Sequence, residues 1–257
     1  MRVRILGCGG SGGVPLIGND WGACDPANPK NRRQRASILV EEQGTTLLVD
    51  ASPDLRAQLL AADIGRLDGV LFTHAHADHV HGIDDLRPIN RRMRAWIPIY
   101  ADSETLTAIE TRFGYVFEKT PEEYGFFKPC LTPNLIKGPF KLGNIDVLPF
   151  EQDHGFGRSS LGFRFGPIAY STDVTELSET AFEALRGVRL WIVDCLRDQA
   201  HPTHAHLART LSWIERVQPE RAVLTHMNQE MDYEALAKRL PDGVEPAYDG
   251  LRLEVLS

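Results

Sequence analysis

Short runs of apolar and β-branched residues recur along the chain, and stretches with helical spacing lie between the later ones. These runs predict strands at Arg2–Leu6, Ser37–Glu41, Thr45–Val49, Gly69–Thr73, Ile145–Phe150, Leu161–Phe165, Ile168–Ser171, Leu190–Asp194 and Ala222–Thr225. The first strands follow one another directly, whereas the last ones alternate with helices. This order predicts one α/β domain over residues 1–257, with sheet layers packed beneath helices.

Local signals predict several element boundaries. Apolar residues at helical spacing predict a helix over Leu207–Val217. Ser52 followed by Pro53 predicts the start of another helix, with Ser52 as its N-cap. The Gln43-Gly44 pair predicts a hairpin turn. The segment Arg112–Pro139 is rich in Phe, Tyr and Pro, and it predicts an irregular excursion that covers part of the molecule.

Composition narrows the class of protein. The chain has 257 residues, with 28 Lys and Arg against 35 Asp and Glu, so its formal net charge is −7. This balance argues against a general polyanion binder but leaves room for a local phosphate pocket. The chain has neither a long apolar run nor a secretory leader at its start, so we expect no membrane partner. The cysteines lack any CxxC pair and predict reduced thiols in the cytoplasm; they are Cys8, Cys24, Cys130 and Cys195.

Histidines cluster immediately after a predicted strand. The stretch THAHADHVHG carries four of the nine histidines, and Asp78 lies among them. Neutral imidazole and carboxylate suit Zn²⁺ and neighbouring divalent ions. In an extended loop His74 and His76 can point to one ion, and Asp78 and His79 can face a second. So many titratable groups would be costly to bury without a metal.

Other histidines also lie at or after the ends of predicted strands, where sites form in layered α/β folds. They are His154 in EQDHG, His226 in LTHMNQ, and the group His201, His204 and His206. A single histidine of this kind is usually a structural residue. His154 and His226 are candidate metal ligands only because they would complete the first cluster.

Taken together, these motifs resemble a known family. THAHADH matches the HxHxDH signature of the metallo-β-lactamase superfamily, and His154, Asp173 in YSTDV and His226 follow in the family's order. The stretches LGCGGSGGVP, GIDDLRP and DCLRDQAHPTHAH resemble its phosphodiesterase branch. That branch includes the tRNA 3′-processing endonucleases and the phosphonate-operon enzymes that hydrolyse 5-phosphoribosyl 1,2-cyclic phosphate. The chain resembles the latter more closely.

The resemblance implies a four-layer αβ/βα sandwich with the site at one edge. It also implies two divalent metal ions per chain, Zn²⁺ or Mn²⁺. The first ion would be held by His74, His76 and His154, the second by Asp78, His79 and His226, and Asp173 would bridge both. Two divalent ions, two carboxylates and a bridging hydroxide leave a charge near +1, which suits a phosphodiester. At His76 the related flavo-diiron oxygen reductases carry Glu, so this donor set favours hydrolysis.

The resemblance places catalytic roles on His204 and Asp78. Thr203 is expected to cap the helix over Leu207–Val217, which would put His204 in the first turn beside a bound phosphate. There a protonated histidine can donate to a leaving alkoxide. His206 is expected to orient His204 or to contact substrate. Ser11, in a glycine loop whose GxGxxG pattern is weak support for dinucleotide binding, is a candidate phosphate contact.

The leading function is therefore hydrolysis of a small cyclic or nucleotide-like phosphodiester, with a nucleoside monophosphate as product or inhibitor. A tRNA 3′-processing endonuclease is an alternative, but the region between Thr107 and Phe140 is neutral and aromatic rather than basic. We therefore expect no extended nucleic acid as a partner. A lactone or thioester hydrolase and a non-enzymatic protein that carries a metal or cofactor are further alternatives. The sequence leaves a homodimer open.

Overall fold

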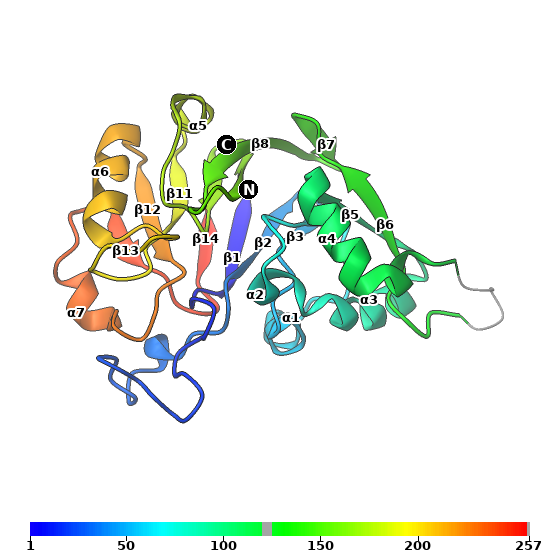
Figure 1. Cartoon of the computed structure of the whole chain (residues 1–257), viewed down its shortest axis with the longest axis horizontal. Helices are drawn as coiled ribbons and strands as arrows, with labels where there is room; N and C mark the ends of the chain where they lie inside the picture. The colour runs from blue at the N-terminus through cyan, green and yellow to red at the C-terminus, as the bar shows by residue number, and fades with distance from the viewer. Residues whose placement is uncertain (120–124, 256–257) are drawn as a thin grey trace.

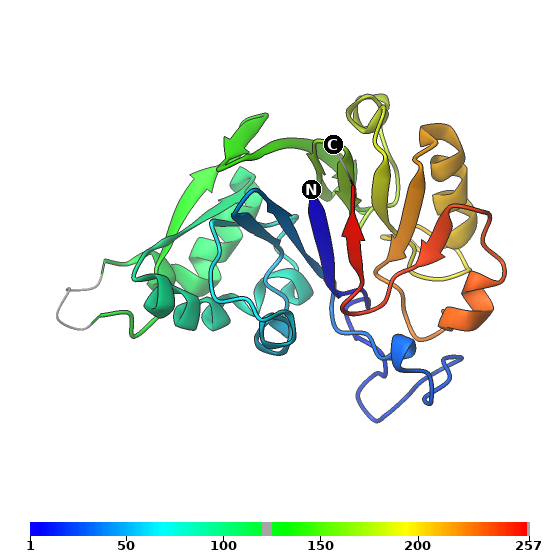
Figure 2. The same ribbon diagram turned by 180° about the vertical axis from the view of Figure 1, so that it is seen from behind.

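Two seven-stranded sheets lie face to face, and helices cover their outer surfaces (Figures 1 and 2). The structure is a computed structural model that describes residues 1–119 and 125–255. The strand order is β14-β1-β2-β3-β4-β5-β6 in the first sheet and β13-β12-β11-β10-β9-β8-β7 in the second. This arrangement is the four-layer sandwich that the family resemblance implies. No helix among the described residues is long and apolar enough to cross a membrane.

The elements have the following bounds. The first sheet contains β1 (Arg2–Gly7), β2 (Ser37–Glu42), β3 (Thr45–Val49), β4 (Gly69–Leu71), β5 (Ile97–Ala101), β6 (Leu131–Leu135) and β14 (Arg252–Glu254). The second contains β7 (Phe140–Leu142), β8 (Ile145–Asp153), β9 (Ser159–Phe165), β10 (Ile168–Ser171), β11 (Leu190–Asp194), β12 (Arg221–Thr225) and β13 (Val244–Pro246). The helices are α1 (Leu55–Ala62), α2 (Ala77–Val80), α3 (Arg87–Met93), α4 (Ser103–Phe113), α5 (Glu179–Leu185), α6 (Leu207–Val217) and α7 (Tyr233–Ala237). Short 3₁₀ helices are η1 (Pro29–Asn31), η2 (Ile83–Leu86) and η3 (Gly114–Phe117).

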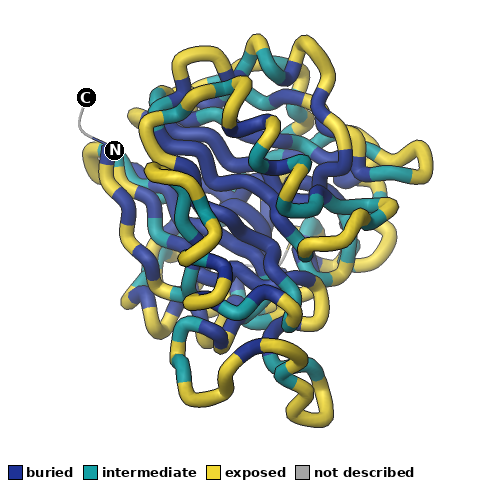
Figure 3. Tube along the Cα trace, turned by 90° about the vertical axis from the view of Figure 1, so that its left-hand side faces the viewer, coloured by how far each residue is buried: buried dark blue, intermediate teal, exposed yellow. Residues whose placement is uncertain are grey.

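Alternation along the strands sorts the apolar side chains into two cores. Ile38 and Val40 of β2 belong to the core between the sheets. Leu39 points the other way, into a second core that it shares with Leu55 and Leu59 of α1. Figure 3 shows the strands as a continuous buried interior beneath exposed loops. A slip of one residue in β2 would exchange these two faces, so the two cores together fix the register.

Both sheets direct their loops to a common edge. In the first sheet β3, β4, β5 and β6 are parallel, and in the second β10, β11, β12 and β13 are parallel. Parallel strands place their carboxyl ends at the same edge of a sheet, where ligand sites usually form. The segments that follow β3, β4, β10, β11 and β12 therefore meet in space.

Several sequence predictions are confirmed. The strands β3, β10 and β11 and the helix α6 have the predicted bounds. Gln43 and Gly44 both have positive φ, 45° and 84°, as a tight hairpin turn requires. The other predicted strands are present with ends displaced by a few residues.

The prediction that a helix starts at Pro53 with Ser52 as N-cap is wrong. Helix α1 begins at Leu55, and its N-cap residue is Asp54. The backbone carbonyl of Ser52 accepts from the amide of Leu55 at 2.9 Å, while its hydroxyl contacts Gln58 at 2.9 Å. Ser52 thus forms a turn ahead of the helix instead of capping it.

The excursion predicted over Arg112–Pro139 is only partly irregular. Helix α4 extends to Phe113, and β6 pairs in parallel with β5. Residues 120–124 of the predicted excursion lie outside the described part of the chain. Within the described part, the Arg91 side chain of α3 donates to the carbonyl of Phe126 at 2.7 Å, so this segment covers α3.

Candidate metal centre

The histidines and aspartates singled out by sequence meet at the shared edge of the two sheets. His74 and His76 follow β4, and Asp78 and His79 belong to α2. The second sheet contributes three residues, each at or just after the end of a strand: His154 after β8, Asp173 after β10 and His226 after β12. Both halves of the sandwich are therefore needed to assemble the cluster.

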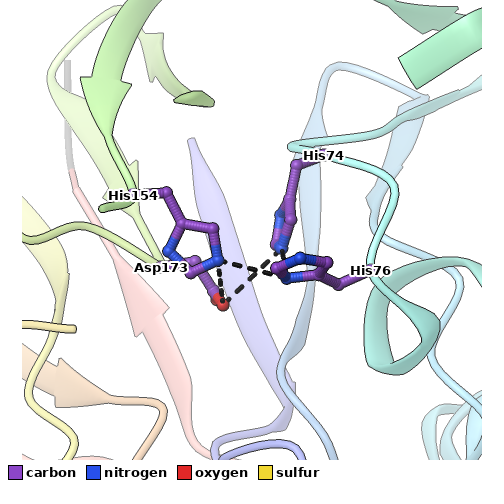
Figure 4. A group of neighbouring side chains, drawn as sticks. All are labelled: His74, His76, His154 and Asp173. Atoms are coloured by element: carbon purple, nitrogen blue, oxygen red, sulfur yellow. Dashed lines mark hydrogen bonds and ion pairs between the residues drawn. The ribbon is translucent and has the colours of Figure 1, made fainter. Parts of the chain in front are cut away.

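A first group of donors surrounds Nδ1 of His76. Nε2 of His74 lies 2.9 Å and Nε2 of His154 lies 3.1 Å from this atom. Oδ1 of Asp173 is 3.6 Å from Nε2 of both His74 and His154. Figure 4 shows the three rings and the carboxylate pointing to a common centre. These four side chains form a candidate metal-binding group.

A second group shares Asp173. Its Oδ2 atom lies 3.1 Å from Nε2 of His79 and 3.3 Å from Nε2 of His226. Oδ2 of Asp78 lies 3.3 Å and 3.5 Å from the same two nitrogens. Asp78, His79, Asp173 and His226 form the second candidate group. One oxygen of Asp173 faces each group, which is the arrangement that a bridging ligand requires.

Unpaired buried atoms show that these residues fit metal ions. Nε2 of His79 and Nε2 of His226 are buried and lack any hydrogen-bond partner within the described structure. A buried polar atom without a partner is costly, so such atoms need an explanation. Both nitrogens point at carboxylates in a group of imidazole and carboxylate donors, the set that divalent transition ions prefer. A cation between them would satisfy both.

Strained backbone marks the same edge. Asp50, Asp173 and His226 have φ of 65°, 54° and 58°. Non-glycine residues adopt this left-handed region infrequently, and each such conformation costs stability unless the surroundings enforce it. All three follow a strand directly or by two residues, so the strain serves to turn side chains into the cluster.

Outer hydrogen bonds orient the rings. Nδ1 of His79 donates to Oδ2 of Asp50 at 2.7 Å, and Nδ1 of His154 donates to the carbonyl of Thr203 at 2.8 Å. The Thr73 hydroxyl donates to Asp50 at 2.9 Å and accepts from Nδ1 of His74 at 3.0 Å. In each of these rings Nδ1 carries a proton, so Nε2 is the atom that can bind a cation when the ring is neutral.

The carboxylates hold a proton in the second group when no cation is bound. Burial opposes a charge on His79, but Asp173, Asp78 and Asp50 outweigh it and raise the pKa of His79 well above its usual value. Burial lowers the pKa of His74, which keeps that ring neutral. Because a histidine ligand must be neutral, cation binding to the second group would release the proton from His79.

His204 lies beside the cluster, but not for the reason that the sequence suggested. The N-cap residue of α6 is His206, so Thr203 does not cap the helix and His204 precedes its first turn. Nδ1 of His204 instead contacts Oδ2 of Asp194 at 3.1 Å, and its Nε2 lies 3.8 Å from Oδ1 of Asp173. Burial disfavours the charged ring, but Asp194 and Asp173 outweigh it and raise the pKa of His204 to about 9.

The remaining predicted residues occupy the periphery. The His201 ring lies 5.3 Å from the His204 ring, and its Nδ1 contacts the Thr203 hydroxyl at 3.2 Å. His206, as N-cap of α6, makes no side-chain capping bond. Ser11 lines a hollow together with Asp78, so it is near the second group. His81 packs against Phe113 instead of joining the cluster.

Sequence reasoning missed three residues at this site: Asp50, Asp194 and Arg158. Asp50 follows β3 and Asp194 ends β11, so the rule that sites form at strand ends points to both. Arg158 lies in the turn after His154, and its guanidinium donates to Nε2 of His76 at 3.1 Å. No spacing rule connects an arginine to a histidine 82 positions earlier in the chain.

The fold and the cluster define a metallo-β-lactamase-fold hydrolase. Residues 45–227 match the family described as Beta-lactamase superfamily domain, and the chain belongs to it. Within this superfamily the chain falls in the PhnP family. A crystal structure of a new diphosphatase from that family has a TM-score of 0.90 and 32% sequence identity, and the match covers 99% of this chain and 98% of that one. The resemblance indicated by the HxHxDH motif is thereby confirmed.

Two curated relatives differ in how much they share. Octanoyltransferase of Porphyromonas gingivalis (strain ATCC BAA-308 / W83) is 34% identical over 259 residues, which cover 98% of this chain but 51% of that protein. The chain thus spans about half the length of this relative. Ribonuclease Z of Bradyrhizobium sp. (strain ORS 278) is 43% identical over 60 residues, or 23% of this chain and 20% of that protein.

Removing the shared carboxylate should empty both groups. We expect metal-saturated wild-type protein to hold about two divalent ions per chain. Asp173→Ala should lower the metal content more than His74→Ala or His226→Ala, because Asp173 alone belongs to both groups. Elemental analysis after gel filtration measures this, with the exposed Asp146→Ala as the matched control. Equal losses in Asp173→Ala and in either histidine variant would contradict a bridging role.

Proposed function

We propose that the chain hydrolyses a small cyclic or nucleotide-like phosphodiester, with two divalent cations in the centre. The observation that carries this proposal is the position of Asp173. Its two oxygens face separate donor groups, and His204 lies 3.8 Å from one of them. This geometry supports a proton donor beside a centre for two cations, a combination suited to expelling a poor leaving group.

The donor set suits Zn²⁺ or Mn²⁺. His74, His76 and His154 would hold one ion, Asp78, His79 and His226 the other, and Asp173 both. When bound, such ions supply Lewis acidity toward phosphoryl oxygens and lower the pKa of water. The four cysteines are unpaired and buried, which supports a reducing compartment such as the cytoplasm.

His204 is the residue that we assign to proton donation. Asp194 accepts from its Nδ1, so the second proton of the charged ring lies on Nε2, the atom nearest the centre. Burial opposes the charge, but with no cation bound Asp194 and Asp173 outweigh it and raise the pKa of His204 to about 9, so the ring carries both protons at neutral pH. Cations bound to Asp173 would cancel part of the increase in the pKa of His204. The part caused by the contact with Asp194 would remain. His204 can therefore deliver a proton to a departing oxygen.

Two substrate classes follow from the relatives. The motifs favour a cyclic phosphodiester such as 5-phosphoribosyl 1,2-cyclic phosphate, whereas the similar crystal structure is of a diphosphatase, which favours a phosphoanhydride. A phosphate group leaves readily, while a sugar alkoxide of high pKa needs a proton. The Asp194–His204 pair therefore favours the diester, and the anhydride remains the second candidate.

RNA processing, acyl transfer and metal or cofactor transport have less support. The ribonuclease Z likeness covers 23% of this chain. Arg91 of α3 donates to the backbone carbonyl of Phe126, so this part of the aromatic segment is tied to the fold and does not extend as an arm for RNA. Burial raises the pKa of the thiols of Cys8, Cys24 and Cys195, so none of these three is an activated nucleophile for acyl transfer. A non-enzymatic carrier would not need the Asp194–His204 pair.

A substrate panel tests the proposal. Metal-loaded protein should hydrolyse bis-p-nitrophenyl phosphate and a 2′,3′-cyclic nucleotide faster than p-nitrophenyl phosphate, because a diester leaves one ester arm to depart and a monoester resembles the product. A nucleoside monophosphate should inhibit competitively. A dinucleoside diphosphate, a lactone and precursor tRNA complete the panel. Faster turnover of the monoester, the lactone or the tRNA would overturn the assignment.

Loss of His204 should affect substrates according to their leaving groups. His204→Ala should lower kcat for a 2′,3′-cyclic nucleotide by roughly 10²–10⁴-fold, the scale of acid–base catalysis. Hydrolysis of bis-p-nitrophenyl phosphate should fall much less, because p-nitrophenolate departs without a proton. Metal content should stay unchanged, and Ser212→Ala, an exposed position on α6, is the control. Equal losses on both substrates would show that His204 positions phosphate and does not donate a proton.

A further inference from the structure

A hollow with an apolar wall opens beside the second donor group. Its volume is about 540 Å³, and Leu16, Ile17, Pro53 and Ala77 form the wall. Asp78, a member of the second group, lines the same space, which we call the apolar hollow. The apolar hollow therefore adjoins the centre, and the proposed reaction gives it no role so far.

Hydrogen bonds hold the loop that supplies the first part of this wall. The backbone amides of Val14 and Arg33 each donate to the carbonyl of the other residue, at 2.8 Å and 2.9 Å. The guanidinium of Arg33 donates to the carbonyl of Asn228, in the segment after β12, at 3.1 Å. A Cβ on Gly12 would lie 2.4 Å from Cδ2 of Leu16, so Leu16 packs directly on the glycine loop. The loop, dark blue in Figure 1, is thus anchored to the chain on both sides of the hollow.

Ile17 presents its whole side chain to water at this place. Among the described residues it is the most exposed of the large apolar side chains. A single exposed apolar residue is common and needs no explanation. Ile17 differs because Leu16 and Pro53 extend the apolar surface from it toward Asp78 in one hollow. An apolar ligand group placed against this surface would remove it from water, which favours binding.

The charges around the apolar hollow disfavour an anionic occupant. Nε of Arg35 lies 3.0 Å from Oδ2 of Asp54, and the Arg35 amide donates to the same oxygen at 2.9 Å. Asp78 directs its Oδ2 atom to Nε2 of His79 and of His226, at 3.3 Å and 3.5 Å. Among the described residues that line the hollow, no cationic side chain lacks a carboxylate partner. An anionic group would find no unpaired positive charge there, whereas an uncharged group loses nothing.

The position of His204 indicates which part of a substrate would enter. A phosphodiester has two ester arms, and the oxygen of the departing arm has to lie near Nε2 of His204. His204 does not line the apolar hollow, whereas Asp78 does. We propose that the apolar hollow binds the ester arm that stays on phosphorus, and that this arm is uncharged and apolar, as an alkyl chain is. The proposal rests on the proposed function and narrows its substrate class to diesters with such an arm.

Two diesters with the same leaving group test this proposal. Methyl p-nitrophenyl phosphate and hexyl p-nitrophenyl phosphate differ only in the arm that stays on phosphorus. With Mn²⁺-loaded wild-type protein, below the concentration at which micelles form, kcat/KM should be higher for the hexyl ester by roughly tenfold or more, because each buried methylene adds to binding. The difference should lie mainly in KM, since the arm is bound alike before and during the reaction.

Substitutions at the exposed Ile17 leave the fold intact and change the wall. Ile17→Ser should lower the hexyl-to-methyl ratio of kcat/KM by roughly threefold or more, and Ile17→Leu should keep it. Leu135→Ser is the matched control, because Leu135 is an exposed leucine on β6 that does not line the hollow, and it should keep the wild-type ratio. Calorimetric titration of the products, methyl phosphate and hexyl phosphate, should show the same preference in wild type and the same decrease in Ile17→Ser.

The failures of the two proposals are distinguishable. Equal kcat/KM for the two esters in wild type, or a ratio that Ile17→Ser leaves unchanged, would overturn the subsite and leave the diesterase activity standing. A wild-type dimer that becomes a monomer in Ile17→Ser on gel filtration, with an unchanged ratio, would assign the apolar wall to a contact between two copies of the chain instead. Hydrolysis of neither ester by wild-type protein would overturn the proposed function itself.

Discussion

The rest of the site depends on one buried carboxylate. Asp173 is 1% exposed, sits in the left-handed backbone region and directs one oxygen to each donor group. Burial raises the pKa of a carboxyl group, yet the rings of His226, His79, His204 and His74 outweigh it and hold the pKa of Asp173 well below its usual value. A charge this deep is tolerated only because five imidazoles from both sheets surround it.

This arrangement links folding to the site. The first sheet supplies His74, His76, Asp78 and His79, and the second supplies His154, Asp173 and His226, so no donor group is complete within one half. Asp50 and Asp194 add a further carboxylate from each sheet, one against His79 and one against His204. The core between the sheets therefore determines the distances between the donor atoms. A bound cation would in turn reduce the electrostatic repulsion among these closely spaced donors.

The sequence predicts the parts of the molecule that local patterns control. Apolar runs predict nine of the described strands, six of them with displaced ends, but not β5, β6, β7, β13 or β14. His74, His76, Asp78 and His79 follow from spacing because six consecutive residues carry them all. His154, Asp173 and His226 could be assigned through the family's order of motifs. Thr203 shows where local reasoning fails, since a residue with good capping chemistry lies three positions before the true N-cap of α6. Asp194 orients His204 across a loop, and Arg158, between β8 and β9 of the second sheet, reaches His76 after β4 of the first, so only the folded chain reveals either contact.

The central claim is that Asp173 joins two cation sites. Crystals of Mn²⁺-loaded protein, measured on both sides of the manganese absorption edge, test this claim most directly. We expect two anomalous peaks, one among His74, His76, His154 and Asp173 and the other among Asp78, His79, His226 and Asp173. A single peak under saturating Mn²⁺, or two peaks of which only one contacts Asp173, would contradict the account.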